Sequence, residues 1–412
     1  MKLKSLLLGS AAALALSTGA QAADPIANFV SLGVCDAYGI SGLTIESDDT
    51  CLKISGKVDY EYRVTNWDTL GTFYDNGHGV EWQLLFEATT QTDAGAAKAV
   101  LRLNDVPGTN GEDVRIERAF VSFGDTTVLT AGRIGSLFST TILDQKYGSR
   151  HEDFIDFWNF DNNDIGKGYS ILNTVRTGGM GIQIESLIAD GFSVLVALED
   201  LAVDGTFGLG VAYDANGISA EAGILFGDLY DNVAGDPINF YLNASADFDN
   251  FTVRGGFIAD DAGAWVASIG ADATFDMFSL KADALFDEPG NWTIAGEGSF
   301  AATDTVDIFV GAAFTEFAGG TDTWTIYGGA EFGLTENISA RAQVGYIENA
   351  RSTDAVVPAV PPLPATRLAL GDVVYGEIGL SYAPGGGFKS SLDLTATDRG
   401  DYQVTFSAEK SF

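Results

Sequence analysis

The chain has 412 residues, and its 57 acidic residues outnumber its 22 basic residues enough to give a formal net charge of −35. Such an acidic chain is not expected to bind nucleic acid, because contacts with phosphate need a basic surface. Two histidines and two cysteines also leave little for a zinc or haem site built from nitrogen and sulfur ligands. With 46% hydrophobic and 11% aromatic residues, the chain nevertheless has the composition of a folded protein.

Residues 1–22 have the pattern of a signal peptide. Two lysines form a basic start, residues 6–16 form a short apolar run, and an Ala-x-Ala cleavage site ends at Ala22. The alternative is a membrane anchor helix, which the shortness of the apolar run and the lack of a basic stop-transfer segment disfavour. We therefore predict a mature domain of residues 23–412, in which no apolar run is long enough for a transmembrane helix.

Export would place the chain in an oxidising compartment, where paired cysteines form disulfides. Cys35 and Cys51 are therefore predicted to be bonded to each other, within an N-terminal segment of residues 23–51. Closing a loop of this size contributes about 3 kcal/mol of stability in the chain-entropy model. The alternative is that both cysteines are buried free thiols.

A period of two runs through the sequence from residue 52 to the end. In the first such segment, Leu52–Val64, apolar residues alternate with charged and polar residues. Because successive side chains of a strand point to opposite faces, each segment is predicted to be a strand with one apolar face and one polar face. The alternation recurs in segments that begin near residues 80, 238, 265, 324, 338 and 402. Short connections rich in Gly, Asn and Asp require that neighbouring strands be antiparallel.

The alternation fits two fold classes that differ in where water lies. In a soluble β-sandwich the apolar faces point inward and the chain divides into domains of about 100 residues, but no linker divides this sequence. In an outer-membrane barrel the apolar faces meet lipid, and aromatic residues gather near the strand ends. Trp82, Trp265 and Trp324 lie near such ends, and the last alternating segment finishes with Phe412. We therefore predict an all-β fold, a transmembrane antiparallel up-and-down β-barrel.

Four stretches at the two ends of the chain carry a family resemblance: the signal-like opening, Val34–Gly39, Asp48–Val58 and the last strand with Phe412. They resemble the outer-membrane porins of alphaproteobacteria of the Rhizobiales type. The resemblance implies a homotrimeric, 16-stranded diffusion pore. It also implies a cell outer membrane location among lipid and lipopolysaccharide, with a third extracellular loop folded into the channel. Counting every alternating run gives about 20 strands, so 18 or 20 strands stay open beside 16.

The longest stretch without clean alternation, residues 136–168, is predicted to be this constriction loop. Its aromatic residues argue against disorder, and long loops in compact folds are commonly functional. The resemblance to porins implies that the loop lies in the channel and that its acidic residues line one side of the narrowest part. These residues are Asp144, Glu152, Asp153, Asp156, Asp161 and Asp164.

The opposite side of the constriction is predicted to be basic. More than half of the cations of the mature chain lie between Lys53 and Arg176. The residues assigned to the basic side, by strand parity or by position beside the loop, are Lys57, Arg63, Arg102, Arg118, Arg133, Lys167 and Arg176. A basic wall facing an acidic loop would create a transverse field that orients dipolar solutes and hinders apolar ones. The alternative is that these cations only pair with acidic residues across neighbouring strands.

The function that the sequence favours is that of a general porin, a passive channel for small hydrophilic solutes and ions with a mild preference for cations. Two alternatives are a substrate-selective sugar channel with an aromatic track and a plugged structural or adhesive barrel. His78 and His151 lie in predicted loops and no nucleophile motif accompanies them, so no enzymatic activity and no catalytic residue are predicted. No acidic cluster has the ligand spacing of a calcium loop, and no metal or cofactor is predicted.

Overall fold

The structure, a computed structural model, describes residues 34–47, 49–67, 73–106, 113–138, 177–230, 237–318, 322–357 and 366–412. The predicted signal peptide lies outside these ranges. Among the described residues, no helix is long and apolar enough to cross a membrane.

Antiparallel strands make up nearly all of the described chain, after a short helix, α2 (Val34–Ala37). The strands are β1 (Leu43–Glu46), β2 (Thr50–Trp67), β3 (Phe73–Thr92), β4 (Gly95–Asp105), β5 (Val114–Gly124), β6 (Thr127–Ile134), β7 (Gly179–Ala189), β8 (Phe192–Glu199), β9 (Thr206–Ala215), β10 (Ile218–Phe226), β11 (Ile238–Phe248), β12 (Phe251–Asp260), β13 (Trp265–Phe275), β14 (Phe278–Asp287), β15 (Trp292–Thr303), β16 (Val306–Glu316), β17 (Thr323–Gly333), β18 (Ile338–Val357), β19 (Thr366–Gly385), β20 (Phe388–Thr397) and β21 (Tyr402–Ser411).

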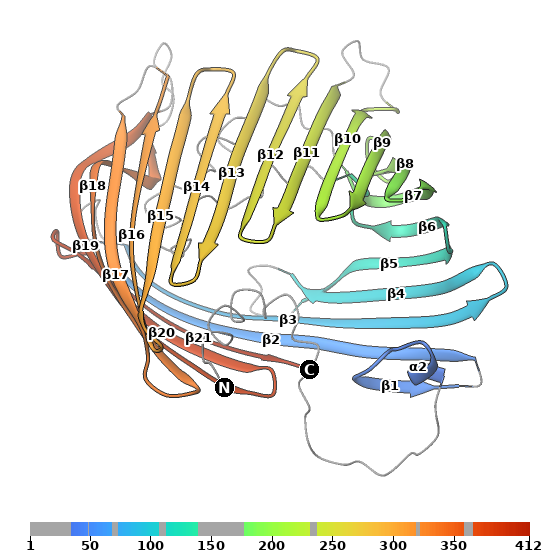
Figure 1. Ribbon diagram of the computed structural model, residues 1–412, viewed down its shortest axis with the longest axis horizontal. Coiled ribbons are helices and arrows are strands. Elements are labelled where there is room, and N and C mark those ends of the chain that lie inside the picture. The colour runs from blue at the N-terminus through green and yellow to red at the C-terminus, as the bar shows by residue number, and fades with distance from the viewer. Residues whose placement is uncertain are drawn as a thin grey trace.

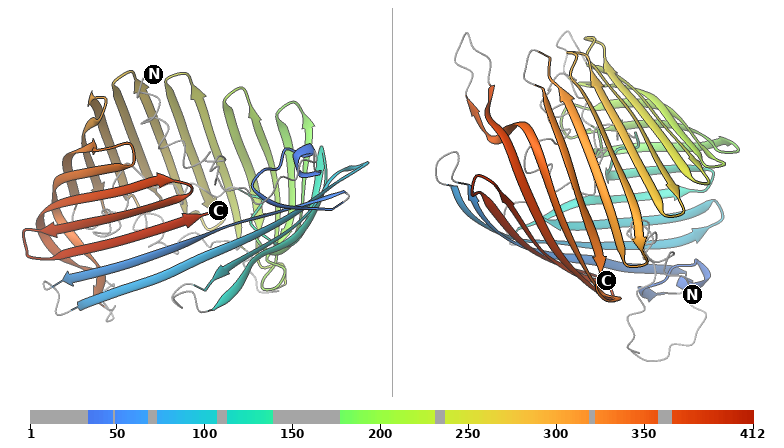
Figure 2. Two further views of the ribbon diagram at one scale, coloured as in Figure 1. Left: turned by 90° about the horizontal axis from the view of Figure 1, so that it is seen from below. Right: turned by 60° about the vertical axis from the view of Figure 1, so that its left-hand side comes forward.

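Each strand from β2 to β21 pairs with its neighbours in chain order, and β21 pairs back onto β2 to close the ring. Figure 1 shows the strands following one another around the wall, and Figure 2 shows the red β20 and β21 beside the blue β2. The described residues therefore form a closed antiparallel barrel of 20 strands, with β1 added beside the first part of β2. The strand number is 20, an alternative that the alternation left open, and not the 16 that the family resemblance implies.

The closing seam depends on a glycine. Gly56 of β2 and Phe412 exchange two backbone hydrogen bonds, each 3.0 Å long between nitrogen and oxygen. A Cβ at Gly56 would lie 2.6 Å from the carbonyl oxygen of Gln83 on β3 and 2.8 Å from the Phe412 ring. The absence of a side chain at Gly56 therefore lets the last residue of the chain pack onto the first strand of the barrel.

The alternation of the sequence maps onto the two faces of the wall. On β2, the apolar side chains of Val58, Tyr60 and Tyr62 are exposed on the outside. Lys57 and Arg63 have the opposite parity and face inward, because side chains alternate along a strand. Residues that are paired across two neighbouring strands share a face. The strand register therefore gives every strand of the barrel one outward and one inward set of side chains. The wall is thus apolar outside and polar inside, as predicted.

The two ends of the barrel differ in their connections. At one end the hairpins turn in a few residues, as at Asn216 and Gly217, both with positive φ, between β9 and β10. Such backbone angles suit the two-residue turns that match strand twist. At the other end lie the longer connections, including the one between Ile134 and Gly179 that joins β6 to β7. The predicted constriction loop falls within that connection.

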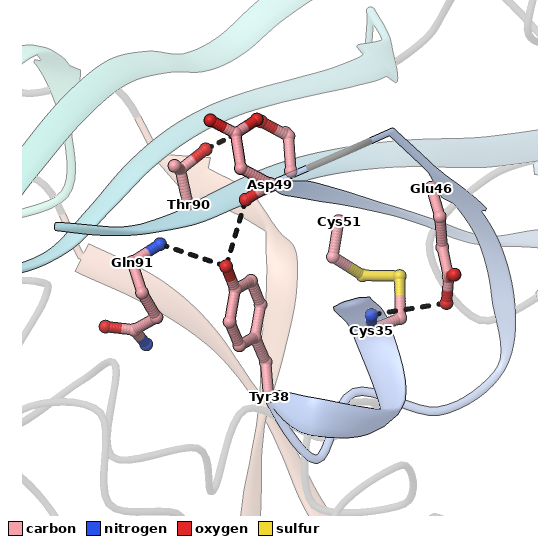
Figure 3. The surroundings of a disulfide bond; sticks show 8 residues. Cys35, Tyr38, Glu46, Asp49, Cys51, Thr90 and Gln91 are labelled. Carbon is pink, nitrogen blue, oxygen red and sulfur yellow. Dashed lines mark hydrogen bonds between the residues drawn. A yellow bond between two sulfur atoms is a disulfide. The ribbon is translucent and has the colours of Figure 1, made fainter. Parts of the chain in front are cut away.

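The N-terminal segment is fixed at the short-turn end of β2 by a disulfide between Cys35 and Cys51 (Figure 3), so the predicted cysteine pairing is confirmed. The hydroxyl of Tyr38 donates a hydrogen bond to the carbonyl oxygen of Asp49 (2.9 Å) and accepts one from the N–H of Gln91 (3.3 Å). The segment around α2 is therefore tied to both β2 and β3.

Aromatic rings on the inner wall lie over glycines of adjacent strands. A Cβ at Gly311 would come 2.1 Å from the ring of Tyr327, and a Cβ at Gly345 would come 2.3 Å from the ring of Tyr375. Both tyrosines are at most 6% exposed. The glycines thus leave the space that these rings occupy next to the wall.

Candidate functional site

The acidic side of the predicted constriction lies outside the described residues, and so do two of its predicted cations. This applies to Asp144, Glu152, Asp153, Asp156, Asp161, Asp164, Lys167 and Arg176. The five other cations lie on described strands, and the structure places them in three different environments.

Lys57 and Arg63 lie on the inward face of β2, where each has an acidic partner two residues away. Lys57 Nζ is 2.6 Å from Asp59 Oδ2, and Arg63 Nη2 is 2.8 Å from Glu61 Oε1. Side chains two positions apart share one face of a strand, so these ion pairs form along the wall. Both cations are thus paired with acidic residues, as in the alternative, but along one strand and not across neighbouring strands.

Arg102 of β4 projects into the lumen within a small polar cluster. Its Nη2 donates a hydrogen bond to Gln83 Oε1 of β3 (3.1 Å), and its Nε lies 3.3 Å from Glu117 Oε2 of β5. The same oxygen of Glu117 accepts a hydrogen bond from Asn104 Nδ2 (2.8 Å). One carboxylate thus links the arginine and the amide of β4 to the next strand.

A β-bulge in β5 explains why this strand presents two consecutive charged residues to the lumen. The register with β4 shifts between the pairs Arg102–Arg118 and Leu103–Ile116, which leaves Glu117 as the extra residue. Ile116 and Ala119 accordingly both face outward. Glu117 and Arg118, which lie between them, both face the lumen. Bulges re-aim side chains in this way and are common beside functional sites.

Arg118 therefore lies directly opposite Arg102 on the inward face. Within the described ranges, Arg118 has no acidic partner at ion-pair distance, whereas Arg102 has Glu117. Two like charges at directly opposed positions repel each other. Arg118 is thus the predicted basic-wall residue whose charge is least compensated by the described part of the wall.

Arg133 has a different position from the one predicted. It pairs with Ala119 of β5 and with Met180 of β7, and both belong to the outward-facing parity. The prediction for Arg133 was wrong because β6 has small and polar residues on both parities, so the sequence pattern does not define its faces. Arg133 is exposed on the outside of the barrel and is not part of the inner wall.

The wall far from β2 carries charged residues that the sequence argument did not single out. Arg254 of β12 forms ion pairs with Asp272 of β13 and Asp283 of β14. Arg341 of β18 forms one with Glu377 of β19. Parity within each hairpin was the available signal, because these residues lie on the polar face of alternating strands. Both arginines are thus engaged with carboxylates of the wall.

The two ends of the connection between β6 and β7 meet at Glu199, the last residue of β8. Its side chain is completely buried (0% exposed). Its Oε1 accepts a hydrogen bond from the N–H of Leu137 (2.7 Å), and its Oε2 accepts one from the N–H of Gly178 (2.6 Å). The carboxylate thus joins the chain before the undescribed segment to the chain after it.

Gln183 of β7 completes this contact. Its Nε2 donates hydrogen bonds to Glu199 Oε1 (2.6 Å) and to the carbonyl oxygen of Gly135 (2.7 Å). Gln183 is itself buried on the inward face. The backbone groups at the two ends of the segment are therefore satisfied by one carboxylate and one amide of the barrel wall.

No metal site is formed by the side chains that the structure describes, where no three His, Cys, Asp or Glu residues gather closely enough to hold an ion. His78 lies on β3, in register with Tyr62, and not in a loop as the sequence argument expected. His78 is thus a strand residue of the barrel wall.

Comparison with known sequences gives one family. A family model described as "Porin subfamily" matches residues 22–361. Porin Omp2a of Brucella ovis is 30% identical over 212 residues, which cover 48% of this chain and 60% of that protein. Porin Omp2a of Brucella suis biovar 1 is 28% identical over 255 residues, which cover 58% and 67%. This chain thus spans about three fifths of the first relative.

Comparison with solved structures also gives outer-membrane proteins. A mutant of the Rh. blastica porin has 14% sequence identity and a TM-score of 0.43, with 88% of this chain and 100% of that chain covered. OmpT of Vibrio cholerae, in-vitro folded in its trimer form, has 11% identity and a TM-score of 0.41, with 89% and 100% covered.

Proposed function

The chain belongs to the porin family whose model covers residues 22–361, and on this ground we propose that it forms a passive, water-filled channel for small hydrophilic solutes and ions. It is an integral β-barrel of the outer membrane. The observation that best supports the channel is the closed ring of strands, apolar outside and charged inside, because only such a closed barrel satisfies its backbone in lipid while enclosing a polar lumen.

The inner wall disfavours a substrate-selective channel with an aromatic track. The inward rings of Tyr241, Phe309, Tyr327 and Tyr375 are 1–6% exposed. The hydroxyl of Tyr241 donates to Glu221 Oε1 (2.6 Å), so this polar group is engaged by the wall. Rings that are this buried offer no open face on which a passing sugar could stack. In the described part of the wall, the arrangement therefore favours a general channel over a sugar track.

The constriction of this channel is proposed to have a basic side and an acidic side. We place Arg102 and Arg118 on its basic side, with Lys57 and Arg63 further along the same inner face. The acidic residues of segment 136–168 would face them. The field between the two sides would favour dipolar solutes. Ion pairs such as those of Arg254 neutralise only part of the carboxylates on the rest of the wall. The excess carboxylates would give the channel a mild preference for cations.

Single-channel recording in a planar bilayer tests the proposed function. An open channel gives steady, ohmic current steps, whereas a plugged structural or adhesive barrel gives none. A passive channel also conducts without a chemical reaction, so its conductance should not depend on any cofactor. The absence of steps from protein shown to be folded by its gel mobility would overturn the proposal.

We propose in addition that the barrel assembles as a homotrimer in contact with outer-membrane lipid and lipopolysaccharide. A hollow of about 390 Å³ on β3–β6 is lined in part by small outward side chains, among them Ala88, Ala97, Ala99 and Ala131. Arg133 lies on the same outward face. A charged side chain is costly against lipid, so a protein partner over this face would explain both features. Heat-labile trimers on an unboiled gel are the expected result.

A further inference from the structure

The connection between β6 and β7 is anchored to the barrel wall at both of its described ends. Residues 139–176 are not described, but both ends of this segment are, and they lie beside β7 and β8. A connection of such length is held in one place only if contacts offset its conformational entropy. Contacts at its two described ends are therefore among those that can offset this entropy.

The first anchor is the carboxylate of Glu199. It is completely buried and receives hydrogen bonds from the N–H groups of Leu137 and Gly178, which lie 41 positions apart in the sequence. Hydrogen bonds to an ionised acceptor are the stronger kind, and an unsatisfied buried N–H is costly. Each oxygen of Glu199 binds one end of the segment, so loss of the carboxylate removes a hydrogen bond from both ends at once.

The second anchor is the ring of Phe138, which the wall accommodates through a missing side chain. Phe138 is 3% exposed. A Cβ at Gly208 of β9 would lie 2.0 Å from Phe138 Cε2. The ring also makes an edge contact with Tyr241 of β11, with 6.2 Å between the ring centroids. Gly208 thus leaves the space for the ring of Phe138, the residue that directly precedes the undescribed segment.

We infer that Glu199 and Gly208 are positioning residues of the channel, which fix the two ends of segment 139–176 against the wall and thereby keep its pore steady. Glu199 acts through backbone hydrogen bonds and Gly208 through the space it leaves. Neither is expected to touch a passing solute, since Glu199 is buried and Gly208 has no side chain. The inference about steady current rests on the proposed channel function, but the anchoring itself does not.

Limited proteolysis of the folded barrel in detergent tests the anchoring. The undescribed segment contains the trypsin sites Lys146, Arg150, Lys167 and Arg176. In Glu199→Ala, trypsin should cut within the segment about tenfold faster than in the unaltered protein, as loss of hydrogen bonds to a charged acceptor would allow. Glu199→Gln should have an intermediate rate, because an amide oxygen can still accept one N–H but the amide nitrogen cannot accept the other.

Two further variants keep the test specific. Gly208→Ala should also speed cleavage, and combining it with Phe138→Ala should add nothing further if the two act through one contact. The matched control is Glu297→Gln, which alters another buried inward carboxylate, one bound by the Tyr327 hydroxyl (2.8 Å) on the far wall. This control should be cut at the unaltered rate.

Bilayer recording of the same proteins tests the steady channel current separately from the anchoring of the segment. Glu199→Ala and Gly208→Ala should show greater open-channel current noise, while Glu297→Gln should not. If the unaltered protein conducts no current but the cleavage rates change as expected, the channel proposal fails and the anchoring stands. Equal cleavage of unaltered protein and of folded Glu199→Ala overturns the anchoring. If Glu199→Ala does not fold, unchanged cleavage in folded Gly208→Ala overturns it instead.

Discussion

Arg102 and Arg118 lie directly opposite each other on β4 and β5, so two guanidinium groups share one inward face of the wall. Glu117, the extra residue of the β5 bulge, is close enough to neutralise Arg102 but makes no ion pair with Arg118. Repulsion between the two arginines is thus only partly relieved. A bulge that inserts one acid between two opposed bases leaves a local positive charge in an otherwise acidic barrel.

Replacing Arg118 by glutamine should make the channel more selective for cations, because the least compensated cation of the described basic wall is lost while Arg102 keeps its partner. The measurement is the reversal potential in a salt gradient across a planar bilayer. Arg399→Gln, in the connection between β20 and β21, removes the same charge away from this wall and should shift the potential less. Equal shifts in both variants would contradict a special role for Arg118.

The unaltered channel should itself prefer cations mildly. The inner wall of β12–β19 pairs Arg254 and Arg341 with carboxylates, and further acidic side chains such as Asp260 and Glu297 are buried on the same inner side. Fixed negative charge in a pore raises the local concentration of cations. The same salt-gradient measurement, made at several ionic strengths, should show a preference that weakens as salt screens the wall. Clear anion selectivity would refute this.

Replacing Gly311 by alanine should destabilise the barrel by about 1–3 kcal/mol, the usual cost of overfilling a packed site. The new Cβ would lie 2.1 Å from the ring of Tyr327, which would have to leave the wall and give up the hydrogen bond from its hydroxyl to Glu297. The midpoint of heat-induced mobility change on gels measures the effect. Gly328→Ala serves as the control, because its Cβ would meet only the Phe309 carbonyl oxygen at an ordinary 3.4 Å.

Replacing both cysteines by serine should loosen the N-terminal segment more than the barrel. The disulfide joins residues 16 positions apart, and closing such a loop contributes about 3 kcal/mol in the chain-entropy model. The ring of strands closes through β2 and β21 independently of this bond. We therefore expect proteolysis near α2 and Tyr38 to accelerate while conductance stays unchanged. Loss of the folded barrel in the double variant would show that the disulfide is needed for the fold itself.

The sequence could predict the strands but not every face. Alternation of Leu52–Val64 identifies β2 and its inward Lys57 and Arg63, since a period of two is a local property. A count of 20 strands was open to sequence analysis as well, because most strands have an alternating run of their own. The faces of β5 and β6 were harder to assign, since a bulge shifts the parity of β5 between Ile116 and Ala119 and β6 has small and polar residues on both parities.

The anchoring residues could not be found from sequence at all. Glu199 contacts Leu137, 62 positions earlier, and its role depends on the register between β7 and β8 and on the place where a long connection leaves the wall. Gly208 carries no chemical signal of its own, because its function is the space that Phe138 occupies. Such long-range contacts become visible only once the strands are placed in three dimensions.

Arg133 offers the sharpest test of the outer face, because the two possible surroundings predict opposite signs. If its face of the barrel meets lipid, Arg133→Leu removes a charge that costs about 2–4 kcal/mol at the centre of a bilayer and less near its surfaces, so the barrel becomes more stable. If a second protomer covers the face, the same change removes a polar contact of the interface.

We expect the second result, because the hollow lined by Ala97 and Ala131 lies on the same outward face as Arg133. Arg133→Leu should therefore lower the temperature at which trimers dissociate on an unboiled gel, without lowering the temperature at which the monomer unfolds. Met180→Leu, the adjacent outward residue in register, keeps the face apolar and should leave both temperatures unchanged. A higher dissociation temperature in Arg133→Leu would show that this side chain faces lipid and that the protomers meet elsewhere.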